Sequence, residues 1–114
     1  MNIIVDHMLE TAGKACALLK AIANPHRLMI LCQLVEGEKS VGELASCVGI
    51  RPSSVSQNLA LMRAGGLVAS RRDGQTMWYA IKSPEARTLL ETIYTIYCAP
   101  AKSCGIRTSN RKGK

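Results

Sequence analysis

Five cysteines carry the most reactive side chains of this 114-residue chain, because a thiolate is both a nucleophile and a ligand for soft metals. An odd number of thiols cannot pair completely within one chain, so a disulfide framework of the secreted type is not expected. Each thiol is therefore expected to be a buried packing residue, a metal ligand or a redox-sensitive group. The cysteines are Cys16, Cys32, Cys47, Cys98 and Cys104.

A second group of functional side chains lies around residues 51–63. Here Val55, Leu59 and Met62 recur at helical spacing and leave serine and amide side chains on the other face. Gln and Asn can make paired hydrogen bonds to adenine edges, while Ser and Arg can reach phosphates, so this face predicts a DNA contact. The alternative is a helix face that only meets water. The predicted DNA-binding residues, with two arginines from the following hairpin, are Arg51, Ser53, Ser54, Ser56, Gln57, Asn58, Arg63, Arg71 and Arg72.

The charge balance agrees with a polyanionic partner. Lys and Arg outnumber Asp and Glu by 15 to 8, which gives a formal charge of +7. Part of this excess falls in residues 101–114, which are expected to form a flexible basic tail after a single domain at residues 1–100. Neither a long uncharged apolar run nor a secretory signal is apparent, so a cytoplasmic protein that does not bind membranes is expected.

The helices are predicted from apolar periodicity and from their end signals. Helices are expected at residues 6–23 and 25–35, separated by Asn24-Pro25. Ser40 and Glu43 match a capping box for a short helix that ends at Cys47. Pro52 opens the next helix, which Gly65-Gly66 ends, and a last helix is expected from Ser83 to near Pro100.

Two short strands, at residues 67–72 and 75–81, are predicted to flank a type I′ turn at Asp73-Gly74. Four helices, a hairpin and a final helix make a mainly α winged helix-turn-helix fold, with the helix at residues 52–64 in the major groove. The chain has no Phe, one Trp and three Tyr, so its core is a thin aliphatic one that favours a homodimer.

Four segments resemble the successive signatures of ArsR/SmtB-family repressors: residues 23–31, 40–44, 53–59 and 64–68. The resemblance covers about residues 9–98. It implies a winged-helix dimer whose first and last helices form the interface, and a repressor that leaves its operator when an inducer acts. Asn58 departs from the pattern, because members commonly carry a histidine there, and this departure affects base preference rather than the fold.

Most ligand residues of the metal sites known in this family are absent from this sequence. Residues 40–43 contain no thiol where the arsenic-sensing type has two, and the last helix offers only Glu85 and Glu91. The only histidines are His7 and His26, and His26 is interpreted as a structural residue at a helix start. No cofactor is expected.

Cys32 and Cys98 lie in contexts that resemble the BigR/SqrR/HlyU branch of the family. That resemblance implies a pair of cysteines, on the second and last helices, that detects sulfane sulfur or oxidants. An accessible thiolate would attack the inducer, and the second thiol would resolve the product into a cross-link that weakens operator binding.

Three alternatives remain at this point. Cys32 is instead a small packing residue, as Cys16 and Cys47 are expected to be. Cys98 and Cys104, with or without Cys32, bind arsenite or a soft metal, or Cys104 serves as an accessory thiol. A small thiol enzyme is the remote third option, and the absence of a Cys-x-x-Cys pair and of a βαβ pattern argues against an enzyme.

Overall fold

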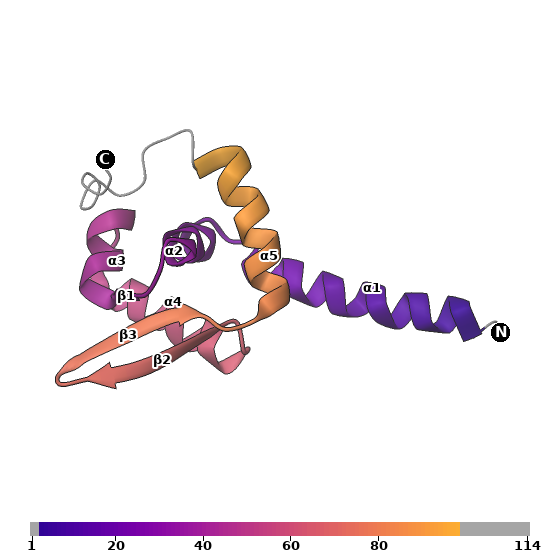
Figure 1. The fold of residues 1–114 in the computed structure, drawn as a ribbon, viewed down its shortest axis with the longest axis horizontal. Coiled ribbons are helices and arrows are strands. Elements are labelled where there is room, and N and C mark those ends of the chain that lie inside the picture. Colours follow the sequence, from indigo (N-terminus) through magenta and orange to yellow (C-terminus); the bar gives the residue numbers. More distant parts are fainter. Residues whose placement is uncertain (1–2, 99–114) are drawn as a thin grey trace.

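The computed structural model describes residues 3–98 and has the expected winged helix-turn-helix architecture (Figure 1). Its elements, in chain order, are α1 (Ile3–Ile22), α2 (Pro25–Val35), β1 (Lys39–Ser40), α3 (Val41–Val48), α4 (Pro52–Ala64), β2 (Val68–Asp73), β3 (Thr76–Ile81), α5 (Pro84–Ile93) and the π-helical turn η1 (Tyr94–Cys98). The mainly helical fold with a hairpin wing is confirmed. Residues 99–114, which include the predicted tail at residues 101–114 and Cys104, lie outside the described part of the chain.

Helix α2 is at the centre of the domain and packs against α3, α4 and α5 (Figure 1). Leu31 of α2, Leu44 of α3 and Leu59 of α4 have no exposed surface and meet in one aliphatic core. The core thus fixes the orientation of α4 relative to the other two helices of the motif.

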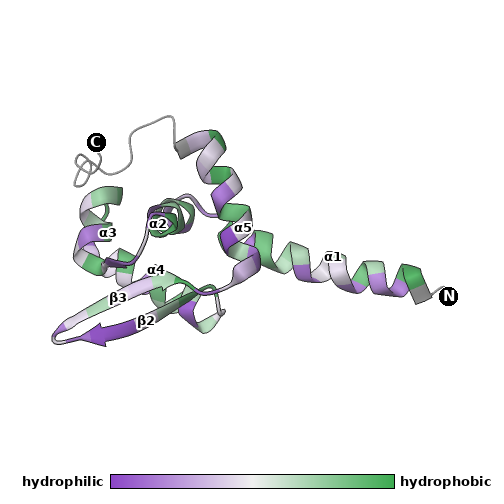
Figure 2. Cartoon of the chain, in the orientation of Figure 1, coloured by the Kyte–Doolittle hydropathy of each residue, from purple (hydrophilic) through white to green (hydrophobic). Residues whose placement is uncertain are grey.

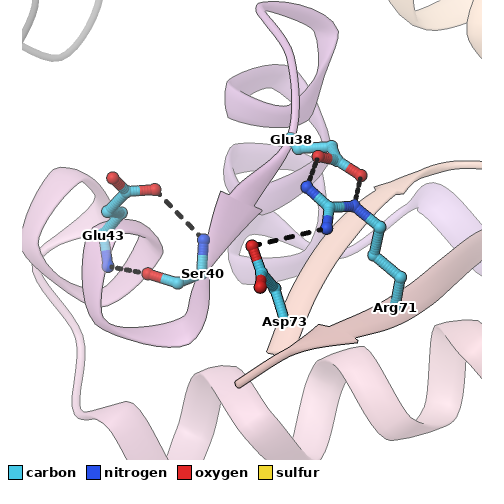
Figure 3. A network of polar contacts seen from close by, with 5 residues as sticks. All are labelled: Glu38, Ser40, Glu43, Arg71 and Asp73. Carbon is cyan, nitrogen blue, oxygen red and sulfur yellow. Dashed lines mark hydrogen bonds and ion pairs between the residues drawn. The ribbon is translucent and has the colours of Figure 1, made fainter. Parts of the chain in front are cut away.

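The helix starts follow the sequence signals closely. Asn24 caps α2, its side-chain oxygen accepting a hydrogen bond of 3.1 Å from the Arg27 N–H, and Pro25 takes the first helical position. Ser40 and Glu43 form the predicted capping box of α3 (Figure 3). The Ser40 Oγ accepts from the Glu43 N–H at 3.2 Å, and the Glu43 carboxylate accepts from the Ser40 N–H at 3.1 Å.

The wing differs from the prediction in two details. The sheet has three antiparallel strands in the order β1-β3-β2, because Lys39 and Ser40 pair with Tyr79 and Trp78. A two-residue strand is too short to show an alternating pattern, so β1 was not predicted. The hairpin turn lies at residues 74–75, since Asp73 pairs with Thr76. It is therefore one residue beyond Asp73-Gly74, with Gly74 at a φ of 65°.

Both terminal helices also differ from their predicted bounds. Helix α1 starts at Ile3 rather than at residue 6, and α5 ends at Ile93, after which η1 replaces regular α-helix up to Cys98. Thr92 and Thr95 donate side-chain hydrogen bonds to the carbonyl oxygens of Thr88 and Glu91, at 3.1 and 2.9 Å. Such bonds to the preceding turn compete with the backbone pattern and accompany distorted helix ends.

Helix α1 extends away from the rest of the domain (Figure 1), and hydrophobic residues follow its length (Figure 2). Only its last turns join the core, through Leu18, Ala21 and Ile22. Of the described helices, none alone has the length and apolar character to cross a membrane, although α1 and α2 together meet those criteria across a 95° bend.

Candidate nucleic-acid interface

Helix α4 separates a buried apolar face from an exposed polar face, as predicted. Val55 and Leu59 are fully buried and Met62 nearly so, which anchors the helix on α2 and α3. On the opposite face three polar side chains are exposed: Ser53, Ser56 and Gln57. A helix held in this way presents short hydrogen-bonding side chains at the molecular surface, as recognition helices in the major groove do.

Ser54 and Asn58 are only half-exposed on the same helix. The Asn58 side-chain amide donates a hydrogen bond of 2.9 Å to the Ser54 carbonyl oxygen, one turn earlier. One of the two amide donors of Asn58 is therefore engaged within α4. The predicted DNA-binding residues of α4 thus differ in solvent exposure, because Ser53, Ser56 and Gln57 are more exposed than Ser54 and Asn58.

Arg51 and Arg63 lie at the two ends of α4, and both are exposed. Arg51 is the residue preceding the helix and its side chain makes no capping hydrogen bond. Its guanidinium is therefore available to an external acceptor. Arg63, in the last turn, places a second positive charge at the far end of the same face.

The two wing arginines have different environments. Arg71 forms a bidentate pair with Glu38, with both nitrogen–oxygen distances at 2.8 Å, and its Nη1 lies 3.9 Å from Asp73 (Figure 3). The hydrogen bond from Arg71 lowers the pKa of the Glu38 carboxyl below its ordinary value. Arg72 is exposed and forms no ion pair with any described residue. Arg71 thus links the wing to the segment before α3, while Arg72 is free to meet a phosphate.

The position of His26 beside α4 was not predicted from the sequence. Asn24, rather than His26, caps α2, and the imidazole is exposed on the side of the recognition helix. Together with Arg51, Ser53, Ser54 and Gln57 it lines a hollow of about 510 Å³. In the sequence, His26 is recognisable only as a basic residue next to Pro25 at a helix start. A role in helix capping does not predict that its side chain lies beside α4.

Cys32 lies on α2 with only 3% of its surface exposed, and η1, which ends at Cys98, packs against the same helix. The Tyr94 hydroxyl of η1 donates a hydrogen bond of 3.1 Å to the Glu36 carboxylate just after α2. The two cysteine-bearing elements are therefore in contact. Cys98 is the last described residue, and its side chain lies outside the description.

The remaining described cysteines do not fit their predicted packing roles. Cys16 is exposed on α1 rather than buried, because most of that helix has no neighbour within the domain. Cys47 is half-buried on α3 and is disulfide-bonded, so it is not simply a core residue. Within residues 3–98 no group of three or more His, Cys, Asp or Glu side chains is arranged to hold a metal ion.

Comparison with known proteins agrees with this geometry. Residues 24–70 match the family of bacterial regulatory proteins, arsR family. The transcriptional activator HlyU of Vibrio cholerae is 43% identical over 94 residues, which cover 82% of this chain and 87% of that protein. The biofilm growth-associated repressor of Agrobacterium fabrum is 40% identical over 96 residues, or 84% and 82% of the two chains.

Solved structures show the same likeness. HlyU from Vibrio vulnificus superposes with a TM-score of 0.81 at 41% identity, covering 84% of this chain and all of that one. The transcriptional repressor BigR from Xylella fastidiosa gives 0.79 at 40% identity, with 86% and 97% covered.

The winged helix-turn-helix fold, the exposed polar face of α4 and the basic wing together define a winged-helix DNA-binding transcriptional regulator. With relatives of this identity and coverage, the chain belongs to the ArsR family, as the resemblance predicted. Its relatives regulate transcription, so the chain is a regulator and the thiol-enzyme hypothesis is rejected.

Proposed function

We propose that this ArsR-family regulator is a repressor that binds operator DNA as a homodimer and is switched by thiol chemistry at Cys32 and Cys98. One observation carries the proposal: α2, which bears Cys32, packs against η1, which ends at Cys98. A bond between these elements would restrain the helix on which α3 and α4 rest. The DNA contacts in this proposal are the residues predicted on α4 and the wing, with Arg71 acting mainly through Glu38.

The chemistry requires two thiols and a sulfur donor or an oxidant. With a low-molecular-weight persulfide, one cysteine thiolate attacks the outer sulfur, which yields a cysteine persulfide and releases the donor as a thiol. The second thiolate then attacks the protein-bound inner sulfur, forms the disulfide and releases hydrosulfide. With a peroxide, the first thiolate is oxidised to a sulfenic acid and hydroxide leaves. The second thiol then displaces water, again forming the disulfide.

The burial of Cys32 supports one order for these steps. A thiol with 3% of its surface exposed is poorly accessible to a dissolved persulfide, so Cys32 acts as the resolving thiol rather than as the first nucleophile. Cys98, at the end of the chain segment that packs on α2, is then the attacking residue. Cysteine thiols that cycle in this way require a reducing compartment, in agreement with a cytoplasmic location.

The homodimer is supported by the apolar surface of α1. Met8, Leu9 and Leu19 are between 52% and 65% exposed on a helix that extends away from its own domain. An apolar stripe of this kind is stable in water when a second copy covers it. A structural neighbour from Mycobacterium bovis, at 29% identity and a TM-score of 0.64, is described as a homodimeric winged helix-turn-helix DNA-binding domain.

The test measures DNA affinity and thiol state on the same samples. A duplex that the reduced protein selects from a random library serves as the operator, and its affinity is measured by fluorescence anisotropy before and after treatment with glutathione persulfide. We expect affinity to fall on treatment and to recover with a reductant, and intact mass to show a loss of two hydrogens. Cys32→Ser and Cys98→Ser should each abolish the response.

Cys16→Ser removes a free, exposed thiol on α1, serves as the matched control and should respond as the natural protein does. Unchanged affinity of the treated natural protein, despite a mass change at its thiols, would contradict thiol switching. A response that survives in Cys32→Ser and Cys98→Ser would assign the switch to other residues. Parallel treatment with arsenite tests the alternative ligand, because a three-thiolate site would gain one arsenic atom and lose it in Cys104→Ser.

A further inference from the structure

We propose that His26 and Arg51 together form a binding site for one backbone phosphate of the DNA, beside the recognition helix α4. The inference rests on the DNA-binding function proposed above. It adds His26, which was interpreted from the sequence as a structural residue at a helix start. Its ligand is a phosphodiester of the duplex, and the contact is to the backbone rather than to a base.

The site is a hollow between the start of α2 and the start of α4. His26 comes from α2, and Arg51 precedes α4, yet both line the same space of about 510 Å³. Ser53, Ser54 and Gln57 complete its polar wall, and the turn at residues 49–50 closes the remaining side. No carboxylate is among these lining residues, so nothing within the hollow neutralises the two basic side chains.

Both basic side chains are available to a ligand. Asn24 supplies the cap of α2, and Arg27 is occupied elsewhere, because its Nε donates to the Ala21 carbonyl oxygen at 2.7 Å. Within residues 3–98 the His26 imidazole forms no hydrogen bond or ion pair, and the same holds for the Arg51 guanidinium. Both side chains are hydrogen-bond donors that face one hollow, and neither is bonded to an acceptor within residues 3–98. Such a pair matches an anionic oxygen better than a neutral group.

The neighbours of the hollow identify the anion as a DNA phosphate. Ser53 and Gln57 belong both to the hollow and to the exposed face of α4 that is predicted to meet base edges. When that face enters the major groove, the groove edge nearest the hollow is a phosphate backbone. A phosphate held there fixes the register of α4 on the duplex without reading sequence.

The test compares three substitutions on two duplexes, the selected operator and a scrambled duplex of the same composition. We expect His26→Ala to weaken both complexes by about three- to tenfold, because a phosphate contact carries no sequence information. His26→Lys should restore affinity, and its plot of log affinity against log salt should be steeper than that of His26→Ala by about 0.9. His7→Ala, which removes the other histidine, exposed on α1, should bind as the natural protein does.

Equal affinity of His26→Ala and the natural protein on both duplexes would overturn the site. A loss confined to the selected duplex would also overturn it, since the contact would then be to a base. If thermal melting shows that His26→Ala is unstable, the lysine variant decides. A folded His26→Lys that binds both duplexes more weakly than the natural protein would refute the site, because a cation at this position should hold the phosphate. Failure of the natural protein to bind either duplex would instead overturn DNA binding itself.

Discussion

At the scale of single residues, α4 shows how burial divides one helix between stability and recognition. Leu59 and Leu61 are two positions apart, so they point to nearly opposite sides. Leu59 is fully buried among α2 and α3, whereas Leu61 has 61% of its surface exposed. The same side chain therefore contributes very differently at the two sites.

Leu59→Ala should lower the free energy of unfolding by about 2–5 kcal/mol, because it removes buried methyl groups and leaves a cavity in the core. Leu61→Ala is the matched control and should change stability by less than about 0.5 kcal/mol. Urea unfolding followed by circular dichroism, at one fixed protein concentration, measures both. Similar losses in the two variants would show that α4 is not oriented as described.

The apolar stripe of α4 was predictable from the sequence because helical periodicity alone defines it. The environments of the polar residues were not. The Asn58 side chain donates a hydrogen bond to the Ser54 carbonyl oxygen, and this depends on its rotamer. Arg71 pairs with Glu38, which is 33 positions away in the sequence, so a local pattern cannot predict that contact. His26 faces the recognition helix only because α2 and α4 meet in the folded domain.

At the scale of elements, the segment between α2 and α3 holds the wing and the C-terminal turn in place. Glu38 pairs with Arg71 of β2, β1 pairs with β3, and Glu36 accepts hydrogen bonds from Lys39 and Tyr94 at 3.3 and 3.1 Å. Lys39 is nearly buried beneath this network, at 4% exposure. The five residues 36–40 thus connect η1, the wing and the start of the helix-turn-helix.

The Glu38–Arg71 pair gives the wing a pH dependence whose sign follows from the lowered pKa of Glu38. A carboxyl with a lowered folded-state pKa stabilises the structure above its ordinary pKa, and this contribution is lost as pH falls through the lowered value. Glu38→Gln should therefore melt slightly below the natural protein at neutral pH, and the difference should vanish in acid. A difference that grows on acidification would contradict the pairing.

Tyr94 provides a test of the contact between η1 and α2. Tyr94→Phe removes only the hydroxyl that donates to Glu36, so η1 should be held less firmly against α2 and disulfide formation between Cys32 and Cys98 should be slower. Tyr97→Phe, at an exposed position of the same turn, should form the disulfide at the natural rate. Timed alkylation and mass spectrometry measure both rates, and equal rates would show that this hydrogen bond does not position the turn.

Element bounds were predictable where capping chemistry marks them, as at Asn24, Ser40 and Ser83. They were not predictable where tertiary contacts decide. Strand β1 exists because β3 is beside it, and η1 replaces a regular helix where threonine side chains bond to the preceding turn. A local pattern contains neither of these partners.

At the scale of the whole molecule, the exposed face of α1 gives the sharpest prediction. Leu9→Glu places a charge among apolar residues that a second copy is proposed to cover, so it should shift the protein from dimer to monomer. Glu10→Lys instead changes an exposed charge on the opposite side of α1, about 160° from Met8 and 180° from Leu19, and should leave the dimer intact. Sedimentation velocity over a range of concentrations separates the two outcomes.

The same pair of variants links the dimer to DNA binding. Two recognition helices on one dimer contact successive half-sites, so loss of the dimer should weaken binding to a two-half-site duplex far more than to a single half-site. Leu9→Glu should therefore lose most of its preference for the longer duplex, whereas Glu10→Lys should keep it. If Leu9→Glu stays dimeric and retains that preference, the interface lies away from this face of α1. The exposed apolar stripe would then have to meet a different partner.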